Sequence, residues 1–158
     1  MFRSTSSSLH LVALVCVAAV LAALVSQHVF DMQPCAWCVF QRLLFLLIAA
    51  VCWLGVVLGK VWTGGYRLAA SLAFLLALGG VASAWYQYSI ASNLFSCSQT
   101  FADQFMVASG LDAGLPWLFG IYATCADARV NLLGMEYALW SLGLFVLVGI
   151  AALRRIGK

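Results

Sequence analysis

Charged residues are scarce in this chain. Eight Lys and Arg and five Asp and Glu make up 8% of the 158 residues, whereas a soluble domain usually carries about 25%. So few charges exclude a soluble enzyme with a hydrated surface, and they leave no basic face for binding nucleic acid. The hydrophobic share of 65% and the mean hydropathy of +1.05 also exclude a disordered chain. The composition therefore predicts a membrane protein.

Charge is absent from the cores of four apolar stretches. A membrane-spanning helix needs roughly 20 residues, and a charged side chain at its centre costs about 2.5–3.5 kcal/mol on insertion scales. Backbone groups in lipid must be paired within the segment, so each span is expected to be helical. We expect one domain, residues 1–158, with spans at about residues 9–29, 41–59, 67–88 and 137–154.

The first apolar stretch has an alternative interpretation as a cleaved signal peptide. Arg3 and the serines at 4–8 resemble the start of such a peptide. The apolar run is longer than the usual run of about 7–15 residues, and no clear small-x-small cleavage site ends it. We therefore expect a retained helix.

The basic residues predict the orientation of the spans. Arg42 and Arg129 lie on one side, and the other side carries the remaining basic residues: Arg3, Lys60, Arg67, Arg154, Arg155 and Lys158. Because cytoplasmic segments are enriched in Lys and Arg, both termini are expected in the cytoplasm. Loops of about 30–40 and 89–136 are then exported, and the apolar segment 115–119 is expected to form a short interfacial helix. The predicted fold class is an all-α, four-helix transmembrane bundle.

The six cysteines are distributed unevenly along this topology. Two of them, Cys16 and Cys52, lie near the middle of spans, where a thiol is usually a small packing residue. The other four lie in the exported loops, in a compartment where disulfides persist: Cys35, Cys38, Cys97 and Cys125.

The Cys35-x-x-Cys38 pair fits redox chemistry better than metal or haem binding. A zinc site needs a second pair or histidines at suitable spacing, and the two histidines of this chain belong to the first span. Covalent haem needs a histidine directly after the second cysteine, and position 39 is Val. No metal site is therefore expected.

Structural disulfides are the competing interpretation of these cysteines. A bridge between Cys97 and Cys125 would usefully close a long exported loop. A bridge between Cys35 and Cys38 encloses only two residues, constrains the unfolded chain little, and so adds little stability. The first pair is therefore better explained as reactive.

Arg42 strengthens the redox interpretation. It follows Cys38 by four residues, or one helical turn, at the exported mouth of the second span. A guanidinium at this point would stabilise the reactive thiolate form of a nearby cysteine. The alternative is an interfacial anchor whose side chain extends to the lipid headgroups.

The motif around this pair resembles that of a known family. The segment Pro34-Cys35-Ala36-Trp37-Cys38-Val39-Phe40-Gln41-Arg42 is similar to the P-C-x-x-C-x-x-[QE]-R signature of the DsbB family, the bacterial inner-membrane disulfide bond formation proteins. The resemblance covers essentially the whole chain. It implies an oxidoreductase of the inner membrane that reoxidises a DsbA-like periplasmic thiol oxidase. It also implies a membrane quinone as electron acceptor, linked to the respiratory chain, and no nucleic-acid partner.

The resemblance implies a role for each site residue. A reduced partner would attack Cys97 of a Cys97–Cys125 disulfide, and the released Cys125 would attack Cys35. Cys38 would then be freed as a thiolate and, with Arg42 beside it, would reduce ubiquinone or menaquinone. The expected catalytic residues are thus the four exported cysteines, and the expected quinone-binding residues are Cys38 and Arg42.

The sequence departs from the family near the outer end of the third span. Family members often have a histidine there, whereas this chain has Tyr86 and Gln87, either of which could replace the histidine's hydrogen bond to the quinone. Two alternatives to the main hypothesis remain. One is an enzyme like vitamin K epoxide reductase, disfavoured because its Cys-x-x-Cys lies on a late span. The other is a membrane scaffold whose disulfides are not catalytic.

Overall fold

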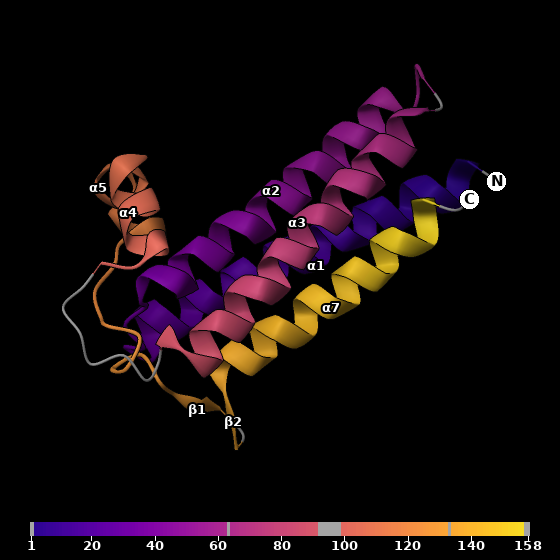
Figure 1. Ribbon diagram of the computed structural model, residues 1–158. Helices are drawn as coiled ribbons and strands as arrows, with labels where there is room; N and C mark the ends of the chain where they lie inside the picture. The colour runs from indigo at the N-terminus through magenta and orange to yellow at the C-terminus, as the bar shows by residue number, and fades with distance from the viewer. Residues whose placement is uncertain (1, 63, 92–98, 133, 157–158) are drawn as a thin grey trace.

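The long apolar stretches form a bundle of four helices. The computed structural model describes residues 2–62, 64–91, 99–132 and 134–156. The bundle consists of α1 (Phe2–Val29), α2 (Ala36–Leu58), α3 (Gly64–Ser89) and α7 (Tyr137–Ile156) (Figure 1). All four are long and apolar enough to cross a membrane. The predicted fold class, an all-α membrane bundle, is confirmed.

Two helices begin clearly before the expected positions: α1 at Phe2, where about 9 was expected, and α2. The second helix begins at Ala36, before the expected start at about 41. Pro34 and the extended backbone of Cys35 (φ −87°, ψ 170°) set this start, because a proline disfavours helical geometry in the residue that precedes it and an extended residue commonly precedes the first helical turn. Cys38 therefore lies within the first turn of α2 instead of in a loop.

Neighbouring helices in the chain pack against one another in the order α1, α2, α3, α7. Contacts between α1 and α7, which would close the ring, are much less extensive than those of α3 with α7 or of α2 with α1 and α3. The bundle is therefore most open between its first and last helices.

Small residues let α3 approach α7 closely. Ala73, Ala77 and Gly80 are buried on α3, and a Cβ added at Gly80 would collide with the ring of Phe145 on α7. The same ring stacks on Phe45 of α2, with centroids 4.0 Å apart and planes 4° from parallel. Small residues at helix crossings allow this close packing in membranes.

The segment between α3 and α7 folds at one end of the bundle, opposite the end where α1 begins and α7 ends (Figure 1). It contains α4 (Phe101–Ala108), α5 (Leu111–Gly114), α6 (Pro116–Phe119) and a hairpin of β1 (Asn131–Leu132) with β2 (Met135–Glu136). Thr100 and Asp103 form a capping box that satisfies backbone donors at the start of α4.

The two aromatic side chains of the segment expected to form an interfacial helix differ in their exposure. In α6 the side chain of Trp117 is exposed, but Phe119 is buried with Val39 and Met106. Phe119 was expected at the lipid headgroups together with Trp117. Instead it attaches this segment to the first turns of α2, because burying an aromatic ring against α2 removes apolar area from solvent.

Candidate redox site

The Cys-x-x-Cys pair lies at the start of α2. Cys35 is the residue that caps the helix, and Cys38 lies in its first turn. The two sulfur atoms are 3.0 Å apart, and Cys35 is only 1% exposed. The helical turn thus holds both thiols in direct contact, so that forming or opening a bond between them requires only a small movement.

Backbone contacts place Cys125 beside Cys35. The carbonyl of Pro34 accepts hydrogen bonds from the amides of Tyr122 (3.1 Å) and Ala123 (3.3 Å). These bonds dock the segment that follows α6 beside the pair, and the Cys125 side chain packs against the buried cluster that contains Cys35. Three of the four cysteines expected to be catalytic are therefore gathered at one place. The fourth, Cys97, lies outside the described residues.

The protonated thiol is the favoured form of Cys35. Hydrogen bonds with Cys125 and then with Cys38, followed by burial, raise the pKa of Cys35 well above its ordinary value. Cys35 is thus a poor thiolate nucleophile, and its sulfur is better suited to being attacked by Cys125.

Two buried glutamines adjoin the pair. Gln87 of α3 donates from Nε2 to the sulfur of Cys38 at 3.1 Å and approaches that of Cys35 at 3.7 Å. Gln41 of α2 donates to Oε1 of Gln87 at 2.7 Å. From the sequence, Gln87 was expected only as a replacement for a histidine that bonds the quinone, and Gln41 was part of the motif without a role of its own. Gln41 follows Cys38 by three residues, a spacing that puts the two side chains on one helix face. This spacing could have indicated Gln41 from the sequence.

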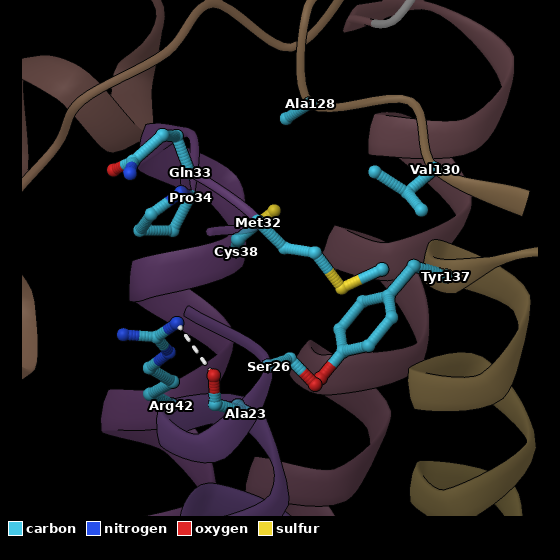
Figure 2. A pocket seen from close by; sticks show the side chains of 10 residues that line it. All are labelled: Ala23, Ser26, Met32, Gln33, Pro34, Cys38, Arg42, Ala128, Val130 and Tyr137. Carbon is cyan, nitrogen blue, oxygen red and sulfur yellow. Dashed lines mark hydrogen bonds between the residues drawn. The ribbon is translucent and has the colours of Figure 1, made fainter. Parts of the chain in front are cut away.

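Arg42 is buried, with 5% of its surface exposed, and its guanidinium bonds to protein oxygens. It donates to Oε1 of Gln27 at 2.6 Å, to the carbonyl of Leu118 at 3.0 Å and to that of Ala23 at 3.4 Å (Figure 2). These three acceptors carry no formal charge, so they do not neutralise the guanidinium. The alternative of an anchor extended to the lipid headgroups does not describe this side chain.

Two cavities meet at Cys38 and Arg42, which line both. The larger, of about 200 Å³, lies between α1, α2 and α7, where the bundle is most open. The smaller, of about 30 Å³, extends toward Met32, Pro34 and the loop before β1 (Figure 2). Cys35 lines neither cavity. The two thiols of the pair thus face different surroundings.

The hydroxyl of Tyr137 also lines both cavities. Ser26 of α1 lines the same two cavities, and Figure 2 shows its side chain beside the hydroxyl of Tyr137. Neither residue was expected at the site from the sequence, because a tyrosine at the start of a span usually indicates only an interfacial aromatic. Within the described ranges, no three His, Cys, Asp or Glu residues form a group that could hold a metal ion.

Comparison with known proteins agrees with the motif. The family described as Disulfide bond formation protein DsbB matches residues 5–154. Disulfide bond formation protein B 1 of Pseudomonas aeruginosa is 34% identical over 137 residues, covering 84% of this chain and 83% of that protein. Disulfide bond formation protein B of Polaromonas naphthalenivorans is 30% identical over 161 residues, covering 95% and 90%. The protein of the same name from Herminiimonas arsenicoxydans is 30% identical over 149 residues, covering 94% and 92%.

The family match extends over nearly all of the four long helices and over the segment that carries Cys125. The matches confirm the resemblance found in the sequence, and they favour it over both the vitamin K epoxide reductase-like alternative and the non-catalytic scaffold. The chain therefore belongs to the DsbB family and is a membrane oxidoreductase of disulfide bond formation.

Proposed function

We propose that this protein reoxidises a DsbA-like, thioredoxin-fold dithiol protein and passes the two electrons to a membrane quinone. The observation that carries the proposal is the difference between the two thiols of the pair. Cys35 is buried in the cluster against which Cys125 packs, whereas Cys38 lines a cavity between helices. This arrangement supports a thiol relay that enters through Cys35 and leaves through Cys38.

The relay begins in the second exported segment. A thiolate of the reduced partner attacks Cys97 of a Cys97–Cys125 disulfide, which forms a mixed disulfide and releases Cys125 as a thiolate. The partner's second thiolate attacks the partner's own sulfur in this mixed disulfide. The partner leaves with a new internal disulfide, and Cys97 is freed. The protein has then gained two electrons as two reduced cysteines.

The relay continues through the contact between Cys125 and Cys35. The Cys125 thiolate attacks Cys35 of a Cys35–Cys38 disulfide, forming a Cys35–Cys125 bond and releasing Cys38 as a thiolate. Cys97 then attacks Cys125, which restores the Cys97–Cys125 disulfide and releases Cys35. The high pKa of Cys35 lets it take up a proton on release. Both electrons now reside on Cys35 and Cys38.

The cavity at Cys38 fits a quinone by the chemistry of its walls. A membrane quinone, when bound, supplies an acceptor for two electrons and two protons. Val20, Phe45 and Leu144 give the larger cavity apolar sides, while Arg42 and Tyr137 place hydrogen-bond donors at its edge. A planar ring with carbonyl oxygens needs this combination of apolar contact and a few polar groups.

Re-forming the Cys35–Cys38 disulfide releases the two electrons and two protons that this acceptor takes up. Arg42 stabilises the Cys38 thiolate before transfer, since a desolvated cation next to a thiolate favours the charged form. Its bonds to Gln27 and Leu118 hold the guanidinium at the cavity wall during this step.

The location of the protein follows from the same proposal. The redox site would face the periplasm at the outer surface of the bacterial inner membrane, and both termini would lie in the cytoplasm. Support comes from the basic residues, because both ends of the chain and the connection from α2 to α3 carry Lys or Arg. These segments lie at the end of the bundle away from the cysteines (Figure 1).

A trapping experiment tests the function. In Cys125→Ser, Cys97 has lost its resolving partner and should form a stable mixed disulfide with a periplasmic thioredoxin-fold protein, visible on a non-reducing gel. Cys97→Ser with Cys125 intact is the matched control and should trap no complex through position 97. The purified wild-type protein should also reduce a soluble quinone analogue only when a reduced dithiol partner is supplied. Absence of both the complex and this activity would refute the function.

A further inference from the structure

The carboxamide of Gln87 contacts the reacting sulfur atoms directly. Its Nε2 lies 3.1 Å from the sulfur of Cys38 and 3.7 Å from that of Cys35. An amide nitrogen carries two N–H donors and accepts nothing, so the sulfur is the acceptor at the shorter contact. Gln87 is 6% exposed, and little water competes for these donors.

Gln41 fixes which end of that carboxamide faces the sulfur. Its Nε2 donates to Oε1 of Gln87 at 2.7 Å, and it is itself 3% exposed. If the Gln87 amide rotated by half a turn, its N–H groups would face the Gln41 donor and its oxygen would face sulfur, leaving buried groups unpaired. Gln41 therefore selects the orientation in which Gln87 donates to Cys38.

The donor reaches Cys38 from α3, which contributes no residue to either of the two cavities at Cys38. Cys38 lines both cavities, and Gln87 lines neither of these two. Arg42 lies on the cavity side, on α2, while Gln87 extends from α3. Cys38 thus has a neutral donor from α3 in addition to the cation on its own helix, and it still lines the larger cavity.

We propose that Gln87 is a catalytic hydrogen-bond donor that stabilises the Cys38 thiolate once the Cys35–Cys38 disulfide opens, and that Gln41 is the residue that positions it. The proposal rests on the relay described above, in which Cys38 leaves as a thiolate. A hydrogen bond to an ionised sulfur is stronger than one to a neutral thiol. Gln87 therefore favours the open, reduced state of the pair with the charge on Cys38 and not on Cys35.

The test measures how fast Cys38 is alkylated in the reduced, full-length protein in detergent. Iodoacetamide reacts with thiolates, and peptide mass spectrometry reads each cysteine separately, so no other cysteine has to be removed. Gln87→Leu should slow Cys38 alkylation about tenfold at neutral pH, as expected for the loss of one charge-assisted hydrogen bond. The plateau rate at alkaline pH, where every thiol is ionised, reports access of the reagent and should match wild type.

Three further variants separate a donor from a packing residue. Gln87→Glu keeps the size of the side chain but replaces the donor with a negative charge. It should slow the alkylation of Cys38 more than Gln87→Leu does. Gln87→His restores an N–H and should recover most of the rate. Gln41→Leu leaves Gln87 in place but removes the residue that orients it. This variant should slow the alkylation of Cys38 by a smaller factor than Gln87→Leu does.

Ser83→Ala is the matched control. Ser83 is a buried polar residue one turn earlier on α3, and in the described contacts it bonds only to the carbonyl of Gly80. Removing its hydroxyl should leave the alkylation rate of Cys38 unchanged. The proposal would be overturned if Cys38 were alkylated at neutral pH as fast in Gln87→Leu as in the wild type. It would also be overturned if Gln87→Leu and Gln87→His slowed this alkylation equally. If Gln87→Leu does not fold, Gln87→Glu carries the same test. Because this assay uses neither quinone nor partner, its failure is distinct from failure of the trapping experiment.

Discussion

Arg42 donates a 2.6 Å hydrogen bond to Gln27, and this contact joins the first turns of α2 to the last turn of α1. Both side chains are at least 95% buried, with 5% of each exposed. A buried charge without partners is costly, so the bonds to Gln27, Leu118 and Ala23 are what allow a guanidinium to remain next to Cys38.

Arg42→Ala should slow quinone reduction about tenfold or more while leaving the fold intact, because a charge-assisted contact is worth about 1.5–3 kcal/mol. Arg42→Lys should recover only part of the rate, since an ammonium cannot reproduce the forked contacts of a guanidinium. The measurement is the rate of quinone reduction over a range of quinone concentrations. The exposed Arg129, paired with Glu136 at 2.5 Å, gives the control variant Arg129→Ala. Kinetics unchanged in Arg42→Ala would refute its assigned role.

Ala23→Leu should obstruct quinone binding. Ala23 lines both cavities at Cys38, and a leucine would project into the space between α1 and α7. The KM for the quinone should rise severalfold, whereas trapping of the partner through Cys97 should persist because that step lies outside the cavity. Ala18→Leu, at an exposed position of the same helix, should change neither. A KM equal to wild type in Ala23→Leu would show that this cavity is not the quinone site.

The reduced protein should lose stability at alkaline pH in a way that the oxidised protein does not. Folding raises the pKa of Cys35 above its ordinary value of 9.0, chiefly through its hydrogen bond with Cys125. A group whose pKa is raised by folding stabilises the fold fully below its unfolded pKa, and this contribution is lost as pH rises toward the folded pKa. The loss should therefore begin above about pH 9.

Thermal unfolding of the reduced protein across this alkaline range measures the effect. The oxidised protein, in which Cys35 has no proton to lose, is the first comparison. Cys125→Ala is the second, and its dependence on pH should be weaker because the main cause of the shift is gone. An identical alkaline decline in the reduced protein and in Cys35→Ala would count against this explanation.

Gly80→Ala should destabilise the bundle by about 1–3 kcal/mol, as overpacking commonly does. A Cβ at this position would collide with the ring of Phe145, which is itself stacked on Phe45. The neighbouring Gly79 has open space around it, so Gly79→Ala is a closely matched control and should be neutral or slightly stabilising. Unfolding by a denaturing detergent, followed by circular dichroism, measures the change in the free energy of unfolding for both variants. Equal stability of the two variants would mean that α3 and α7 are packed more loosely here.

Cys16→Ala and Cys52→Ala should leave the relay intact. Both thiols are completely buried in the bundle core, among apolar side chains. Replacing either one removes a packing contact, at a cost of about 1 kcal/mol in stability, and removes no group of the redox site. Dithiol-dependent quinone reduction by each purified variant checks this. Loss of activity in a normally folded variant would assign these cysteines a role that the packing does not suggest.

Much of the fold was predictable because its cause is local. The four spans follow from uninterrupted apolar residues, since a helix is the way a single segment satisfies its backbone in lipid. The start of α2 was less predictable. Pro34 and the extended Cys35 set it, and a hydropathy pattern does not contain that information. As a result Cys38 belongs to a helical turn, which fixes its distance to Cys35.

The site was predictable only in part. Cys35, Cys38 and Arg42 are close in sequence, and their spacing of three and four residues puts them on one face of the first two turns of α2. Gln87 and Tyr137 come from distant helices, and each reaches the pair only through packing of α3 and α7. Nothing in the residues around either one indicates which way it faces.

The sequence by itself determined that this chain is a membrane bundle with a Cys-x-x-Cys pair just before its second span, because hydropathy, charge and the spacing of the two cysteines depend only on residues close together in the chain. The tertiary structure decided how the two thiols of the pair differ. The carbonyl of Pro34 docks the segment that carries Cys125 onto Cys35, and the open side between α1 and α7 gives Cys38 its cavity. Both depend on contacts between residues far apart in the chain, which only the packed fold brings together.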